Sequence, residues 1–314
     1  MYGEIKLFSG NTHPELAQEI ADYLKIPLSG ADVFEFPNEN IFVRLHSSVR
    51  GQDAFVIQPM SRPVHRSIME LLIMIETLKR DSAGRITAVF PYMAYARSDK
   101  KDQPRVPITG RLLANLVEVA GADRYLTIDL HAGQIQGFFS IPGDELTAFH
   151  IQRNYLLSRN LTNVVVVAPD AGRAKEARYL ADALGAPLAI VEKRRYENNP
   201  TAQAMQLIGD VAGMTAVIFD DEIDTAGTLT NAISFLKEAG ARDIYAVATH
   251  AILSGPAVER LAAAPLTELI LTNTVPIPPE KQLPTMKILS IAPLLGEVIR
   301  RIHFGISVGA LFNE

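Results

Sequence analysis

Short apolar runs alternate along the chain with longer segments that have helical periodicity. Each run is bounded by turn residues, a pattern typical of strands buried on both faces of a sheet. Between the runs, apolar side chains at i, i+3, i+4 and i+7 predict amphipathic helices over 68–75 and 229–236, the second ending near Gly240. Strands that alternate with helices predict an α/β fold with a mostly parallel central sheet flanked by helices. The predicted strands are 54–57, 86–90, 125–128, 164–168, 188–191, 216–219, 244–248 and 269–271.

The order of these segments repeats within the chain. Residues 120–122 lead through a predicted strand to His131, and residues 239–241 lead at the same spacing through another strand to His250. In a chain of 314 residues, such a repeat predicts two tandem domains of similar topology. The predicted domains are residues 1–145 and residues 146–314.

Composition narrows the class of protein. Hydrophobic residues make up 48% of the chain and charged residues 21%, which excludes a disordered protein. The absence of cysteine excludes disulfides, thiolate metal sites and a catalytic thiol. A net charge of −5 argues against a broad nucleic-acid-binding face. No segment approaches the ~18 apolar residues of a membrane span, so we expect a soluble, cytoplasmic protein with no membrane or nucleic-acid partner.

The most informative segment for chemistry is AVIFDDEIDTAGT, residues 216–228. A buried strand ends there in Asp220 and Asp221, and Asp224 precedes a Thr/Gly loop that opens the predicted helix. Backbone N–H groups at a helix N-terminus bind phosphate dianions, and the carboxylates can accept hydrogen bonds from vicinal hydroxyls. The crevice beyond a parallel strand is where such ligands bind. The segment predicts a sugar-phosphate site, and the alternative is an acidic strand end before a capped helix.

Other polar residues also follow predicted strands. His131 comes after 125–128, and Asp170 comes after 164–168. The basic triplet 193–195 ends the strand 188–191 and opens a polar, turn-rich loop, predicted to be mobile, at 194–201. A lone histidine is most often structural, and basic residues at a strand end are most often simply solvated. The residues alone therefore leave their roles open.

Two motifs resemble those of a known family. DDEIDTAGT resembles the phosphoribosyl-diphosphate-binding signature of the phosphoribosyltransferase superfamily. DLHAGQIQGFF, residues 129–139, resembles the signature of the ribose-phosphate diphosphokinase (phosphoribosyl-pyrophosphate synthetase) family, and similar stretches cover nearly all of the chain. The resemblance implies two phosphoribosyltransferase-like domains, with the last dozen or so residues returning to the first. It also implies transfer of the β,γ-diphosphoryl group of Mg-ATP to the C1 hydroxyl of D-ribose 5-phosphate, giving 5-phospho-α-D-ribose 1-diphosphate and AMP.

The same resemblance implies a role for individual residues and a homo-oligomer, a hexamer in the family. Magnesium is the implied cofactor, although an imidazole is an unusual ligand for it. The implied roles are catalysis by Lys193 and Arg195; ATP binding by Asn38, Glu39, Asn40, Arg97 and Ser98; ribose 5-phosphate binding by Arg195, Asp220, Asp221, Asp224, Thr225, Ala226, Gly227 and Thr228; a diphosphate loop at Asp170, Ala171, Gly172 and Arg173; and metal binding by His131 and Asp170.

The chain departs from the family pattern at three places. FPNEN at 36–40 stands where most members read Phe-Ser-Asp-Gly-Glu, which leaves nucleotide preference open. Arg173 stands where a glycine is usual, and Gly309 stands where a hydroxyl is usual in a segment tied to allosteric control. Two alternatives therefore remain: a non-catalytic regulatory homologue, which the retained Lys193 and Arg195 argue against, and a phosphoribosyltransferase, which the segment 129–139 argues against.

Overall fold

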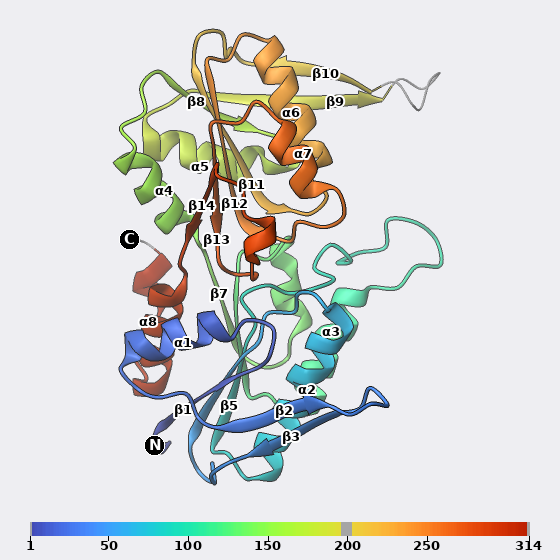
Figure 1. Cartoon of the computed structure of the whole chain (residues 1–314), viewed down its shortest axis with the longest axis vertical. Coiled ribbons are helices and arrows are strands. Elements are labelled where there is room, and N and C mark those ends of the chain that lie inside the picture. The colour runs from blue at the N-terminus through green and yellow to red at the C-terminus, as the bar shows by residue number, and fades with distance from the viewer. Residues whose placement is uncertain (1, 196–202, 313–314) are drawn as a thin grey trace. The chain divides into compact units, whose positions relative to one another are not determined.

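The computed structural model describes residues 2–195 and 203–312, and these form two compact units (Figure 1). Unit 1 contains the chain up to Thr147, Thr274–Pro276 and the segment from Ser290 onward. Unit 2 contains Ala148–Asn273 and Ile277–Leu289. Apart from the short stretch Thr274–Pro276, the chain returns to unit 1 at Ser290, so the returning segment is longer than a dozen residues. The returning segment includes a helix whose apolar face packs in unit 1.

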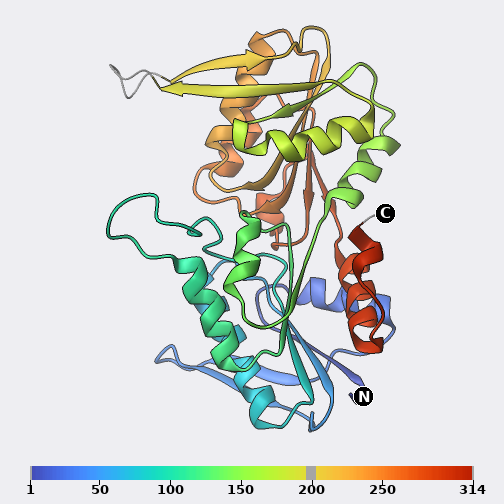
Figure 2. The same ribbon diagram turned by 180° about the vertical axis from the view of Figure 1, so that it is seen from behind.

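Unit 1 is built on a five-stranded parallel sheet in the order β1-β4-β5-β6-β7. Helices α2 and α3 cover one face of this sheet, and α1 and α8 cover the other (Figures 1 and 2). The strands are β1 Ile5–Ser9, β4 Asp53–Ile57, β5 Arg85–Val89, β6 Arg124–Ile128 and β7 Gly143–Leu146. The helices are α1 Pro14–Leu24, α2 Val64–Arg80, α3 Thr109–Ala120 and α8 Ala292–Phe304.

A separate antiparallel hairpin in unit 1 joins β2 (Ala31–Glu35) to β3 (Ile41–Leu45). Phe34, Phe36 and Phe42 form a ring cluster on it, with centroids 5.1–5.8 Å apart. Edge-to-face contacts of this kind stabilise a hairpin that has little core of its own.

Unit 2 is built on a seven-stranded sheet in the order β10-β9-β8-β11-β12-β13-β14, parallel except for the pair β9–β10. Helices α6 and α7 pack on one face, and α4 and α5 pack on the other. The strands are β8 Val164–Ala168, β9 Leu188–Arg195, β10 Gln203–Ile208, β11 Thr215–Ile223, β12 Asp243–Ala251, β13 Glu268–Thr272 and β14 Met286–Leu289. The helices are α4 Phe149–Ser158, α5 Ala174–Leu184, α6 Gly227–Glu238 and α7 Ala257–Ala263.

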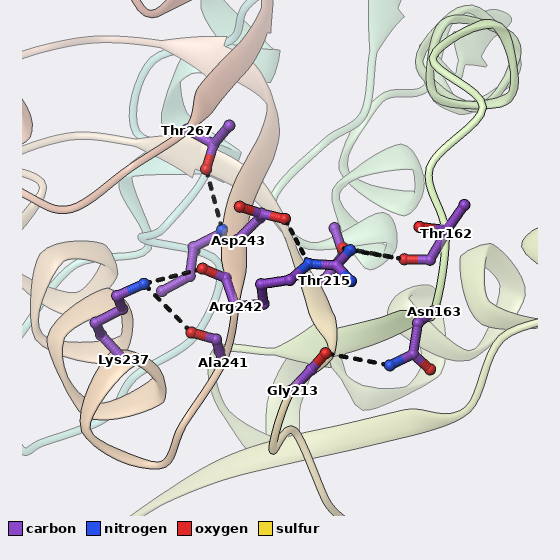
Figure 3. Close-up of polar contacts among 10 residues, drawn as sticks. Thr162, Asn163, Gly213, Thr215, Lys237, Ala241, Arg242, Asp243 and Thr267 are labelled. Atoms are coloured by element: carbon purple, nitrogen blue, oxygen red, sulfur yellow. Dashed lines mark hydrogen bonds and ion pairs between the residues drawn. The ribbon is translucent and has the colours of Figure 1, made fainter.

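The amino-terminal ends of the unit 2 strands are closed by a polar network (Figure 3). Arg242 donates to the Thr215 hydroxyl at 2.5 Å, to the Thr162 carbonyl at 3.2 Å and to Asp243 at 2.8 Å. Lys237 donates to the carbonyl of Arg242 at 2.9 Å. Because these groups are hydrogen-bonded to one another, we interpret this edge as a structural seam, a polar network that stabilises the fold. In parallel sheets ligands bind at the opposite, carboxyl-terminal edge.

The predicted α/β fold with parallel central sheets is confirmed. Among the residues that the structure describes, no helix is both long and apolar enough to cross a membrane.

Candidate active site

The acidic segment of unit 2 is partly strand. β11 continues past the predicted end at Phe219, through Asp220 and Asp221 to Ile223, because it pairs with β12 over that length. Asp224 follows, and its carbonyl accepts the Ser254 N–H at 2.8 Å. The carboxylates therefore project from a rigid, paired strand end.

The loop after Asp224 leads directly into α6. Ala226 has φ +60°, a left-handed conformation, and α6 begins at Gly227. The N–H groups of the first turn of a helix have no acceptor within the helix, and such groups can bind phosphate. The Arg260 guanidinium of α7 donates to the Thr225 carbonyl at 3.0 Å, which places a cation against the predicted phosphate loop. Nothing in the spacing of the sequence indicated Arg260, because only the packing of α7 beside α6 brings it there.

The predicted diphosphate loop lies on the neighbouring strand. Asp170 follows β8, and its Oδ1 accepts the Arg173 N–H at 3.2 Å, closing the short 3₁₀ turn Ala171–Arg173 before α5 begins at Ala174. β8 and β11 are adjacent and parallel, so this loop and the acidic strand end share one edge of the sheet. The Arg173 side chain crosses between them: its Nε lies 3.6 Å from Asp220 Oδ1, and it donates to Asp221.

The ionisation of Asp220 is strongly disturbed. Burial raises its pKa well above the usual value of 3.8, and the neighbouring Asp221 raises it further. The positive charge of Arg173 acts in the opposite direction. A buried pair of like charges is a costly arrangement, and such arrangements gather at functional sites.

The predicted catalytic residues lie on a β-hairpin. Lys193 and Arg195 belong to β9, which pairs antiparallel with β10. The prediction that the loop begins at Arg194 is therefore wrong for Arg194 and Arg195, whose backbone is strand because β10 extends the ladder. The rest of the predicted loop, 196–201, lies outside the described residues.

In unit 1, the predicted nucleotide loop is the tight turn of the β2–β3 hairpin. Phe36 and Asn40 close the turn with an N–H to carbonyl bond of 2.8 Å, and the Asn38 side chain accepts the Asn40 N–H at 3.2 Å. Glu39 has φ +66°, so it holds a left-handed conformation that glycine adopts more readily. The turn thus has a shape suited to glycine although glycine is absent from it.

The other predicted ATP-binding residues follow β5. Arg97 is exposed, and the Ser98 hydroxyl accepts the Thr109 N–H at 3.1 Å at the start of α3. Ser98 therefore fixes this loop against a helix, and its hydroxyl proton remains to be donated. Tyr95, in the same turn, has φ +60°.

His131 follows β6, the strand beside β5, so the two loops share the carboxyl-terminal edge of the unit 1 sheet. Asp129 has φ +40°, and the Leu130 N–H donates to Glu145 at 2.8 Å. Burial raises the pKa of Glu145, which the Leu130 N–H partly offsets. His250, which ends the second copy of the sequence repeat, is buried in β12.

The structure thus places most of the predicted residues at the carboxyl-terminal edges of the two central sheets, whereas Asn38, Glu39 and Asn40 lie in the turn of the separate β2–β3 hairpin. The predicted metal ligands divide between the units, His131 in unit 1 and Asp170 in unit 2. Hard carboxylate oxygens are the donors that Mg²⁺ prefers. Unit 2 supplies several at one edge, so its donor set fits that ion.

Comparisons with known proteins agree over nearly the whole chain. Residues 5–121 match the N-terminal domain of ribose phosphate pyrophosphokinase, and residues 197–313 match the phosphoribosyl synthetase-associated domain. The crystal structure of phosphoribosylpyrophosphate synthetase from Mycobacterium smegmatis has a TM-score of 0.92 at 44% identity, covering 96% of this chain and 100% of that one.

Curated relatives extend the match. A Bacillus subtilis ribose-phosphate pyrophosphokinase is 48% identical over 314 residues, covering 99% of each chain. A ribose-phosphate pyrophosphokinase of Caldanaerobacter subterraneus subsp. tengcongensis is 50% identical over 310 residues, covering 98% of each chain. With that much identity sustained along both partners, the chain belongs to the ribose-phosphate pyrophosphokinase family.

Proposed function

We propose that the chain catalyses the reaction ATP + D-ribose 5-phosphate → AMP + 5-phospho-α-D-ribose 1-diphosphate. The observation that carries this proposal is the shared edge of β8 and β11, where a phosphate-type loop, an acidic strand end and a second loop with a cation lie together. These groups suit a substrate that is a pentose phosphate and that receives a diphosphate in the reaction.

The acidic strand end and the loop after it hold the sugar. Asp220, Asp221 and Asp224 accept hydrogen bonds from the ribose hydroxyls. The N–H groups of 225–228, at the start of α6, hold the 5-phosphate. The left-handed conformation of Ala226 supports this role, because residues of that conformation occur in the backbone concavities that bind anions.

Lys193 and Arg195 stabilise the group in transfer. In phosphoryl-type transfer the protein mainly positions the reactants and neutralises charge on the non-bridging oxygens. Residues on a hairpin that projects from the sheet can approach the phosphates and keep water from competing as a nucleophile. Arg195 also contacts the sugar phosphate.

The residues that we assign to ATP lie in unit 1. Asn38–Asn40, Arg97 and Ser98 bind the nucleotide, and residues 170–173 bind the diphosphate. Amide side chains both donate and accept hydrogen bonds, so they can bind the polar edge of adenine in place of carboxylates.

Mg²⁺ is the cofactor, and His131 and Asp170 are the residues that would hold it. When bound, the ion neutralises charge on the phosphate oxygens. Asp170 is the stronger candidate of the two, because its carboxylate oxygens are hard donors.

The chain works as a homo-oligomer, a hexamer by family resemblance, in the cytoplasm, with two phosphoribosyltransferase-like domains. Sedimentation of the purified protein measures the assembly directly, and a monomer at micromolar concentration would contradict it.

The reaction is tested by product analysis of the purified chain with ribose 5-phosphate, Mg²⁺ and, in turn, ATP, GTP, CTP and ADP. We expect AMP and the 1-diphosphate from ATP. The panel also reports whether FPNEN has changed the nucleotide preference. A requirement for a nucleobase would indicate a phosphoribosyltransferase, and no turnover at saturating Mg-ATP would indicate a non-catalytic homologue.

A further inference from the structure

We propose that Arg173 is the built-in counter-ion of the ribose-binding carboxylates and thereby sets the affinity of the site for the ribose 5-phosphate dianion. This inference rests on the proposed function, because it concerns the same site. It assigns Arg173 a role toward the sugar in addition to any contact with the diphosphate. Arg173 acts through Asp220 and Asp221, so it is a positioning residue.

The backbone of Arg173 is fixed in the diphosphate loop. Its N–H donates to Asp170 Oδ1 at 3.2 Å, within the turn that leads into α5. From this anchor its side chain reaches the end of β11, the adjacent strand, where one guanidinium meets both carboxylates. The loop for one substrate is thus tied by a side chain to the binding groups of the other.

The three side chains are well enclosed. Arg173 is 15% exposed, Asp220 is 18% exposed and Asp221 is 10% exposed. Charges in such surroundings are screened much less by water and salt than a surface ion pair. The two carboxylates therefore repel each other strongly, and Arg173 offsets that repulsion.

The incoming ligand adds further negative charge to this edge of the sheet. The 5-phosphate carries a double negative charge and, in the proposed site, binds to 225–228, directly after Asp224 in the chain. Without Arg173, the dianion would approach an acidic strand end that has lost the cation between its carboxylates, and binding would be weaker. The planar fork of arginine can bond two carboxylates at once, whereas the point charge of lysine cannot do so with the same geometry.

The experiment measures ribose 5-phosphate affinity of the full-length protein by calorimetry, in EDTA so that no divalent cation can replace the arginine. Arg173→Ala and Arg173→Gln should each bind about tenfold more weakly than the native protein, a change of ~1.4 kcal/mol. The affinity of Arg173→Lys should lie between that of these two variants and that of the native protein. Arg178→Ala removes an exposed arginine of α5 and is the matched control, expected to bind like the native protein.

Chemical rescue then separates charge from shape. Millimolar guanidinium should restore affinity to Arg173→Ala, while urea, which has a similar shape but no charge, should not. Near-UV circular dichroism verifies folding, and if the alanine variant unfolds, the glutamine variant decides the question. Affinity in these variants equal to or above the native value overturns the inference, as does equal rescue by urea. If the native protein itself fails to bind ribose 5-phosphate, the proposed sugar site is wrong, and the inference is overturned with it.

Discussion

At the scale of single residues, four loops of the candidate site contain a residue other than glycine with left-handed backbone. Glu39, Tyr95, Asp129 and Ala226 all have positive φ, although none is glycine. Each such residue costs free energy and persists only where the surrounding structure holds it. Six other non-glycine residues of the described chain also have positive φ, among them Lys25, Ser82 and Asn160, so this conformation does not by itself indicate function.

Glu39 gives a direct test of this cost. Glu39→Gly should stabilise the protein by about 0.5 kcal/mol, because relief of ~1–2 kcal/mol of left-handed strain exceeds the ~0.5–1 kcal/mol entropy cost of glycine. Urea unfolding measures the change. Glu39→Ala keeps the Cβ and is the control, expected to show no such gain; equal stability of the two variants would contradict the argument.

We expect the charge of Asp220 to destabilise the fold and to contribute to ribose 5-phosphate binding. Its pKa in the folded state is raised, so ionisation of Asp220 lowers the free energy of unfolding. This loss of stability is absent below about pH 3.8 and grows as the pH rises through the raised pKa. Asp220→Asn should therefore raise the melting temperature at neutral pH by about 2–4 °C, the shift that ~1 kcal/mol produces. The gain should shrink toward pH 4 in a series of thermal melts, while ribose 5-phosphate binding weakens at pH 7. A pH-independent gain would mean that the charge is not its source.

At the scale of elements, the strands that form the sheet centres could be predicted and the edge strands could not. The apolar runs at 164–168 and 244–248 are strands β8 and β12, because burial on both faces demands uninterrupted apolar sequence. β7, with the sequence GDEL, and the half-exposed β2 lack that signal. β10 was missed for the same reason, and with it the true length of β9.

The candidate site divides in the same way. The place of the loop 225–228 before a helix could be predicted, because the residues after it have helical periodicity. Its role in binding phosphate stays a prediction. The contacts made by Arg260 and Arg173 could not be predicted, because they depend on which elements become neighbours. Arg260 needs α7 beside α6, and Arg173 needs β8 beside β11.

The β9–β10 hairpin carries a prediction of its own. Lys193→Ala should lower kcat by about a hundredfold or more, since the proposed contact forms mainly in the transition state. The dissociation constant of ribose 5-phosphate should change little. Steady-state kinetics and calorimetry together measure the two effects, and equal losses in both would make the lysine a ground-state binding residue.

The seam at the opposite edge of unit 2 predicts a stability effect without a kinetic one (Figure 3). Arg242→Ala removes donors to the buried Thr215 hydroxyl and the Thr162 carbonyl and should cost about 1–2 kcal/mol in urea unfolding. Asp243→Asn breaks only the exposed ion pair with Arg242 and should cost less than about 0.5 kcal/mol. Similar losses in both variants would locate the stabilisation in the ion pair.

At the scale of the whole molecule, unit 1 is assembled from separate stretches of chain. The apolar face of α8 packs on α1, and α8 also supplies polar partners to a buried group. Fully buried Asp53 accepts two hydrogen bonds from Arg85, at 2.8 and 2.5 Å, and lies 2.8 Å from His303 Nδ1. Arg85 also donates to the Ile302 carbonyl at 3.1 Å. Removing α8 would strip partners from a buried charge, which is strongly destabilising.

Fragments test this organisation. Residues 148–289 should fold alone, with a cooperative urea transition and native-like far-UV circular dichroism, because they contain all of unit 2. Residues 1–147 should not fold cooperatively unless a peptide of residues 290–314 is added. A cooperative transition of 1–147 alone, unchanged by the peptide, would show that α8 is dispensable for that core.

The interrupted path of unit 1 also has a consequence for biosynthesis. A ribosome delivers residues in order, so unit 2 is complete once β14 has emerged, whereas unit 1 must wait for α8. The half of the protein that begins first is therefore finished last. Until then its nascent sheet exposes the apolar face that α8 will cover, the kind of surface that chaperones recognise on growing chains.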